Sequence, residues 1–374
     1  MAITPYLLFL FCLFGFIFFW KIPYPRSSVR FDGTSSKISI IIPARNEAKN
    51  LGRLLRSLRD QPLKAHEIII VDDHSEDLTA EVGREAGSIV IPSKDLPEGW
   101  TGKPWACWQG AHKATGDIFA FLDADTFLES DGLSRILSTF LERGGLLSIQ
   151  PFHRMEKIYE RLSAIFNLAI MAGMNRFTLW GSRQKPSGAF GPCMVCSRQD
   201  YFAVGGHEKV RGEILESLSL GKEFLRTGRP VHCYGGRGTI SFRMYPEGLR
   251  SLIEGFSKGF GTGANAMPLV SLFMMVCWVT GGAAVTRHLL QAAFWTDQIA
   301  LGIWMTLDAL YILQIHWMLR RIGNFGFSTA LFFQFPLLFF ILVFMLSLLR
   351  IFAVQKVRWK GRIVATSERR KPDG

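Results

Sequence analysis

Two aspartates in the segment FLDADT have the residue type and spacing of a metal site. Asp123 and Asp125 are separated by one small residue and follow an apolar run that predicts a strand. Residues two apart in an extended chain point the same way, so both carboxylates can approach one hard cation, Mg²⁺ or Mn²⁺. That cation would neutralise a diphosphate. A lone D-x-D also arises by chance, and the following Thr126 could cap a helix equally well. The preceding strand and the motifs below favour the metal site.

A second acidic pair ends another predicted strand, HEIIIVDD. Adjacent residues of a strand point to opposite sides, so only one of Asp72 and Asp73 is expected to face a cleft. We expect Asp73 to do so and to accept hydrogen bonds from a nucleobase or a ribose. Asp77 stands where the next predicted helix begins, and a capping role is expected there.

A loop rich in glycine and tryptophan, PEGWTGKPWACWQGA, lies between the two acidic segments. Lys103 follows Gly102 in this loop, and its ammonium group could bind a phosphate as a point charge. A solvated surface lysine is the alternative. The chain contains neither G-x-x-x-x-G-K-[ST] nor G-x-G-x-x-G, which excludes the usual P-loop and dinucleotide fingerprints.

The elements that must position these side chains alternate between strands and helices. Apolar runs predict strands in KISIIIPARNE, HEIIIVDDHS, SIVIPS and DIFAFLDADT, and leucines at helical spacing predict a helix in NLGRLLRSLRDQ. This alternation predicts an α/β domain with a doubly wound sheet, in which ligands bind beyond the carboxyl ends of the strands. The loops with Pro43, Asp73 and Asp123 lie at those ends, so we expect them to converge on one cleft.

The N-terminal residues are apolar and are followed by basic ones. Residues 1–22 begin with an uncharged run close to the roughly 20 apolar residues that cross a bilayer. We expect a retained transmembrane anchor, because the basic start and the small cleavage-site residues of a signal peptide are missing. Lys21, Arg26 and Arg30 then place the middle domain in the cytoplasm by the positive-inside rule. The net charge of +12 is better explained by an anionic membrane surface than by nucleic acid, which we do not expect as a partner.

The C-terminal third is expected to form membrane helices over 266–353 and a basic cytoplasmic tail over 354–374. Its apolar segments span roughly 268–286, 299–319 and 327–349. Three crossings here would place the basic tail outside, against the positive-inside rule, so we expect one segment not to cross. The segment 299–319 carries Asp308, Gln314 and His316, which are costly in hydrocarbon, and we expect it to be interfacial or re-entrant.

Two segments before this region are expected at the membrane surface. Residues 154–177 are predicted to be helical, with Arg154, Lys157, Arg161 and Arg176 around an apolar middle. A core helix is the alternative to an interfacial one. The second interfacial segment is expected over 241–265.

Taken in order, the motifs resemble those of family-two inverting glycosyltransferases of GT-A fold. The segments that carry the resemblance are IIPARNE, VDDHSEDLT, FLDADT, GPCMVCSRQDYFAVGGHE and ILESLSLG, followed by an aromatic and basic segment and apolar helices. A narrower likeness, to diapocarotenoid acid glucosyltransferases, lies in SAIFNLAIMAGMN, GAFGPC, VGGHE, FRMYPEG and WKGR. The resemblance implies a GT-A type doubly wound mixed sheet domain over 37–240, with N- and C-terminal transmembrane helices.

The resemblance also implies the donor site. By matching position, the residues that border the uridine of a UDP-sugar are Pro43, Arg45, Glu47 and Asp73. Asp123 and Asp125 would hold the diphosphate through Mg²⁺ or Mn²⁺. The family's Q-x-x-R-W segment is replaced by EGFSKGF, with Lys258 where the arginine would stand. A diphosphate-binding role for Lys258 is therefore a hypothesis.

The segment ILESLSLG departs from the family at the catalytic position. Most members carry Glu-Asp there, and the aspartate deprotonates the acceptor hydroxyl; here Glu216 is followed by Ser217. Either Glu216 is the base, or the acceptor needs none. A carboxylic acid, with a pKa near about 4, is already ionised at neutral pH, so a base would contribute little. The substitution therefore favours a carotenoic acid as acceptor.

We thus predict a multi-pass enzyme of the cell membrane with a cytoplasmic catalytic domain. It would transfer glucose from UDP-glucose to the carboxylate of a carotenoic acid, with Glu216 and Asp125 as catalytic residues. The alternatives are transfer to a polyprenyl phosphate, a hydroxylated lipid or a polysaccharide. A membrane protein that binds nucleotide sugars without turnover is the alternative outside enzymes.

Overall fold

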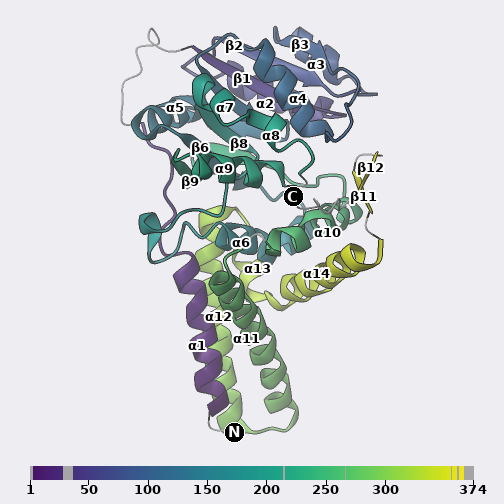
Figure 1. The fold of residues 1–374 in the computed structure, drawn as a ribbon. Helices are drawn as coiled ribbons and strands as arrows, with labels where there is room; N and C mark the ends of the chain where they lie inside the picture. The colour runs from purple at the N-terminus through teal and green to yellow at the C-terminus, as the bar shows by residue number, and fades with distance from the viewer. Residues whose placement is uncertain are drawn as a thin grey trace, which may run out of the picture.

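The computed structural model describes residues 3–27, 37–213, 215–265, 267–354, 356–359 and 362–365. A domain built on a sheet occupies one end of the molecule, and a bundle of long helices projects from the other (Figure 1). Shorter helices lie between these two parts. Residues 366–374 of the expected tail lie outside the described residues.

The sheet domain is organised around seven strands in the order β3-β2-β1-β4-β8-β6-β9. β1 is parallel to β2 and β4, whereas β8 runs antiparallel to β4 and β6, so the sheet is mixed, as expected. The strands are β1 (Ile38–Ala44), β2 (Glu67–Asp72), β3 (Ile89–Pro92), β4 (Ile118–Leu122), β6 (Leu146–Gln150), β8 (Cys193–Ser197) and β9 (Val231–Gly235). Ile40, Ile41 and Ile42 of β1 are all fully buried, which explains the unbroken apolar run in this strand.

Helices cover both faces of this sheet. They are α2 (Ala48–Arg59), α3 (Thr79–Glu85), α4 (Gly102–Lys113), α5 (Gly132–Arg143), α7 (Arg198–Ala203), α8 (Gly206–Lys209) and α9 (Glu216–Arg226). The leucines of α2 and the apolar side of α5 share one core, and α4 belongs to the core on the other face. A Cβ on Gly110 would lie 2.5 Å from Ile41 Cγ2, so this glycine lets α4 approach the sheet closely.

A small second sheet connects the sheet domain to the helical part. It contains β5 (Thr126–Leu128), β10 (Ile240–Phe242) and β7 (Phe152–His153), in the order β5-β10-β7. β10 runs antiparallel to β5, with Phe242 opposite Thr126. This register brings the chain after β10 back to the aspartate motif that precedes β5.

The segment 154–177 does not form the single helix that we expected. It forms a 3-10 helix, η1 (Ile158–Ser163), then α6 (Ala164–Gly173). Most side chains of α6 are buried, because the helix packs against α10 (Leu249–Asn265), α11 (Leu269–Phe294), α12 (Gln298–Ile322) and α14 (Gln334–Val354). Its apolar middle is covered by protein.

The projecting bundle consists of α1 (Ile3–Phe18), α11 and α12, and a turn at 295–297 joins α11 to α12 (Figure 1). By length and composition, α11 and α12 are the two described helices that could cross a membrane. α1 has 16 residues, fewer than the roughly 20 that we expected of an N-terminal span.

The expectation that 299–319 forms a re-entrant element is wrong. This segment lies in α12, an unbroken helix of 25 residues that packs against both α1 and α11. Two of its polar side chains have hydrogen-bond partners on other helices: Gln314 donates to Cys12 O at 2.8 Å and accepts from Trp278 Nε1 at 2.8 Å, and Asp308 accepts from Gln334 at 3.1 Å. The helix outside the bundle is instead α14, which lies at an angle to it beside α10; α13 (Phe327–Leu331) precedes it (Figure 1).

Candidate active site

The Asp123 motif lies at the carboxyl end of β4 and is held by backbone contacts. Asp123 N donates to Pro192 O at 3.0 Å, and Thr126 N donates to Asp123 O at 3.1 Å. Both aspartates are half-buried. The pKa of Asp125 is raised to about 8 by its burial and by the negative charges of Asp123 and Glu47.

This concentration of negative charge fits a divalent cation, which would offset the repulsion between the carboxylates. Among the described residues, no group of three or more His, Cys, Asp or Glu side chains is arranged around one point. The chain would therefore supply Asp123 and Asp125 as ligands, and diphosphate oxygens and water would supply the rest, as is usual for Mg²⁺.

Lys103 lies between two acidic side chains that are far apart in the sequence. Its Nζ is 2.6 Å from Asp123 Oδ1 and 3.3 Å from Glu216 Oε1. Burial disfavours the charged ammonium, but the two carboxylates outweigh this effect and raise the pKa of Lys103. Lys103 is thus a fixed positive charge beside the predicted metal site, in the first turn of α4, and a freely solvated lysine is excluded.

Glu216 is the acidic residue of the ILESLSLG segment that reaches this cluster. It is the first residue of α9, and Ser217 Oγ donates to its Oε1 at 3.0 Å. Ser217 is only 6% exposed, and a Cβ on Gly191 would lie 2.6 Å from its Oγ. The position where the family carries an aspartate is therefore tightly enclosed, and Glu216 is tied to both Ser217 and Lys103.

The residues expected at the uridine gather at the ends of β1 and β2. Arg45 Nη1 lies 3.6 Å from Asp73 Oδ2, and Asp73 N donates to Ala44 O at 2.8 Å. Asp73 is 4% exposed. Pro43 pairs with Val71 inside the sheet, so it supports this edge from within.

Glu47 and Asp77 also lie on this side of the domain. Glu47 Oε2 accepts from Asn50 at 2.7 Å, and the negative charge of Glu47 contributes to the raised pKa of Asp125. The expected capping role of Asp77 is confirmed, because its carboxylate accepts from the backbone N–H groups of Thr79 and Ala48, the first residues of α3 and α2.

Comparison with known proteins identifies the family. Residues 39–203 match the family described as Glycosyl transferase family 2. The 4,4'-diaponeurosporenoate glycosyltransferase of Staphylococcus aureus (strain MRSA252) is 37% identical over 88% of this chain and 89% of its own. That of Staphylococcus haemolyticus (strain JCSC1435) is 38% identical over 88% of each chain. The chain belongs to glycosyl transferase family 2. It is therefore a glycosyltransferase.

A solved structure shares the fold of this chain. The mannosyltransferase PcManGT from Pyrobaculum calidifontis, in complex with GDP-Man and Mn²⁺, matches with a TM-score of 0.55 and 15% identity. The match covers 94% of this chain and 98% of the other. At this identity the likeness establishes the shared GT-A-like fold.

In the present chain, one segment near the Asp123 motif was not expected from the sequence alone. Residues 243–246 continue from β10, whose last residue Phe242 lies opposite Thr126, and therefore run beside the 123–125 turn. The pKa of Tyr245 is raised by its burial and by the negative charge of Asp125. In the sequence, the segment FRMYPEG stands out only through the resemblance, because the pairing of β10 with β5 cannot be inferred from the residues themselves. Lys258 lies in α10, with its side chain outside the described residues.

Proposed function

We propose that this glycosyltransferase transfers glucose from UDP-glucose to the carboxylate of a carotenoic acid, with inversion, to form a glycosyl ester. The relatives' name, 4,4'-diaponeurosporenoate glycosyltransferase, supports an acceptor of this class. The observation that carries the proposal is the environment of Glu216. Its carboxylate is paired with Lys103 and accepts from Ser217, and the neighbouring position holds no acidic side chain.

An acceptor that is already an anion removes the need for a base. In the proposed reaction, a carboxylate oxygen of the acceptor attacks the anomeric carbon as the bond from that carbon to the diphosphate breaks. UDP leaves from the opposite face, so the configuration inverts and no proton has to be removed. A cation held by Asp123 and Asp125 would stabilise the negative charge of the leaving diphosphate. Lys103 adds a second positive charge at the same place, and Arg45 and Asp73 orient the nucleotide.

The helical part supports a membrane setting for this reaction. We propose that α11 and α12 cross the bilayer with α1 packed beside them, and that α14 lies at its surface, with exposed apolar side chains such as Phe335, Leu338 and Leu342. The even number of crossings between the sheet domain and the tail then places both on one side. Lys21, Arg320 and Arg321 mark that side as cytoplasmic.

The role of Glu216 gives the test of this proposal. Glu216→Gln keeps the shape of the side chain and part of its hydrogen bonding. With a carotenoic acid as acceptor, we expect a loss of kcat smaller than the roughly 10²- to 10⁴-fold typical of losing a general base. A collapse of kcat with the acid, alongside unchanged binding of UDP, would mean that Glu216 deprotonates the acceptor and that the proposal is wrong.

A further inference from the structure

A short segment joins the predicted metal site to the helices at the membrane side. Residues 243–246, called the strap below, form the first part of the connection between β10 and α10. Because Phe242 pairs with Thr126, the strap begins beside the 123–125 turn, and three residues after it α10 begins. The strap therefore belongs to the direct chain connection between the second sheet and α10.

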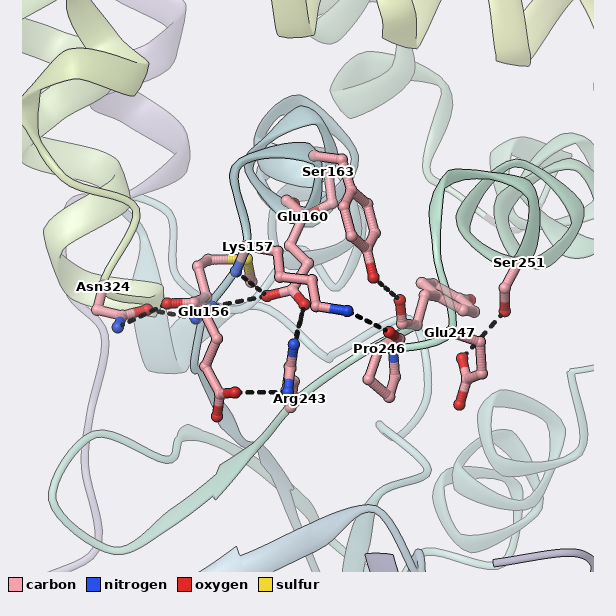
Figure 2. A network of polar contacts seen from close by, with 12 residues as sticks. Glu156, Lys157, Glu160, Ser163, Arg243, Pro246, Glu247, Ser251 and Asn324 are labelled. Atoms are coloured by element: carbon pink, nitrogen blue, oxygen red, sulfur yellow. Dashed lines mark hydrogen bonds and ion pairs between the residues drawn. The ribbon is translucent and has the colours of Figure 1, made fainter. Parts of the chain in front are cut away.

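The first residue of the strap is fixed by a buried ion pair. Arg243 donates to Glu160 Oε1 from Nε at 3.0 Å and from Nη2 at 2.6 Å, and its Nη1 lies 2.5 Å from Glu156 Oε2 (Figure 2). Glu160 is 1% exposed and also accepts from the backbone N–H groups of Glu156 and Lys157. Charge-assisted hydrogen bonds of this kind are stronger than those between neutral groups, so Arg243 is held firmly against Glu160.

Two more contacts hold the rest of the strap against the same part of the chain. Tyr159 donates its hydroxyl to Tyr245 O at 2.8 Å. Lys157 Nζ donates to Pro246 O at 3.4 Å (Figure 2). The residue Asn324, just after α12, joins this region to the bundle, because its side chain accepts from Met155 N at 2.6 Å. The strap is thus attached on one side to the sheet domain and on the other to the helical part.

Tyr245 stands at the centre of the strap in a backbone conformation that tyrosine rarely adopts. Its φ is 55°, in the left-handed region, where a bulky side chain is strained. Such strain persists only where the surroundings determine the conformation, and it is concentrated at functional sites. Its ring packs on α10: the ring centroids of Tyr245 and Phe256 are 5.4 Å apart, and a Cβ on Gly255 would collide with the edge of the phenol.

We propose that Tyr245 is a positioning residue, whose ring sets the distance between the 123–125 turn and α10. α10 packs against α14, so it lies between the donor site and the surface that we assign to the membrane. When the distance between the 123–125 turn and α10 is fixed, a lipid-like acceptor that arrives along α10 and α14 can attack the anomeric carbon, and water is kept away from it. This inference rests on the proposed transfer to a membrane acceptor.

A set of four variants tests the proposal: Tyr245→Phe, Tyr245→Ala, Gly255→Ala and the double variant of the last two. Gly302→Ala is the matched control, because Gly302 is also helical and a Cβ there meets nothing within 4 Å. Purified protein in detergent would receive UDP-glucose and Mn²⁺ with and without the carotenoic acid. Glycosyl product and total UDP would be measured, with KM for donor and acceptor.

We expect Tyr245→Phe to resemble the wild type, because the packed ring is kept. Tyr245→Ala should lower transfer by about 10- to 100-fold, the cost of misplacing reacting groups by about 1 Å. In this variant the KM for the acceptor should rise, and so should the fraction of UDP that is released by hydrolysis. The KM for the donor should stay within about threefold of the wild-type value. Gly255→Ala should have the same effect in the wild-type background and almost none in Tyr245→Ala, because the ring that the new methyl group displaces is then gone.

Three outcomes would overturn the proposal. If Tyr245→Phe is as impaired as Tyr245→Ala, the hydroxyl acts and the packed ring does not. If Gly255→Ala and Tyr245→Ala have additive effects, the ring does not mediate the contact with α10. If transfer and hydrolysis fall together at a fixed ratio, Tyr245 does not position the acceptor. Failure of the wild type on the acid would instead refute the proposed acceptor, and the same variants would then be compared on the carotenoid alcohol.

Discussion

Replacing Lys103 by methionine removes the ammonium group that lies between Asp123 and Glu216 and keeps most of the aliphatic volume. In the donor complex, the ammonium would be one of two positive charges beside the diphosphate. A hydrogen bond to a charged partner contributes about 1.5–3 kcal/mol. The Lys103 side chain is 23% exposed, which favours the lower part of that range. Because each 1.4 kcal/mol is tenfold, we expect kcat/KM for UDP-glucose to fall about 10- to 30-fold.

Lys103→Met should not weaken the binding of Mn²⁺, although it lowers kcat/KM for UDP-glucose. Lys103 contacts Asp123 Oδ1 at 2.6 Å and thus competes with a cation for that oxygen. Without donor, Lys103→Met should therefore bind Mn²⁺ at least as tightly as the wild type, as measured by calorimetry or by the electron paramagnetic resonance of free Mn²⁺. Lys113→Met, an exposed lysine of the same helix, is the control. Unchanged kcat/KM for the donor, or weaker Mn²⁺ binding, would refute this account of Lys103.

Three further predictions concern the metal, the acceptor position and the topology. Asp123→Ala and Asp125→Ala should each abolish transfer, as should EDTA, and near-normal activity with saturating Mn²⁺ would exclude the metal site. Ser217→Asp should lower the free energy of unfolding by about 2 kcal/mol or more, because it adds a charge at an enclosed position beside another carboxylate, and should not enable transfer to an alcohol; unchanged thermal stability with new alcohol transfer would contradict this. A cysteine at Thr296, in the turn between α11 and α12, should react with an impermeant maleimide in intact cells, whereas one at the exposed Glu85 should not; the reverse pattern would invert the proposed topology.

The central sheet was predictable because its strands carry their own signal. Ile40, Ile41 and Ile42 are buried on both faces, and such runs alternate with helices in the order of the chain. The second sheet was not predictable, because β5 pairs with β10, whose residues lie far away in the sequence. The path of the strap, and hence the place of Tyr245, depends on that long-range pairing.

The same distinction applies to the site and to the membrane helices. The position of Asp123 follows from its strand. The contact of Lys103 with Glu216 depends on the tertiary fold, which brings the first turns of α4 and α9 together. Hydropathy indicated the apolar segments, but it did not show that α14 is the helix that lies outside the bundle. Asp308 and Gln314 argued against a helix in the bundle only while their partners, Gln334 and Cys12, were unknown.

The bond that joins glucose to the product shows whether the acceptor is a carboxylate. Purified enzyme in detergent would be incubated with UDP-glucose, Mn²⁺ and either a carotenoic acid or the matching carotenoid alcohol. Each product would then be treated with mild alkali and analysed for released glucose by mass spectrometry. We expect the acid to give a glucosylated product that loses its glucose in alkali, because it is an ester, and the alcohol to give little product. An alkali-stable product formed only from the alcohol would contradict it.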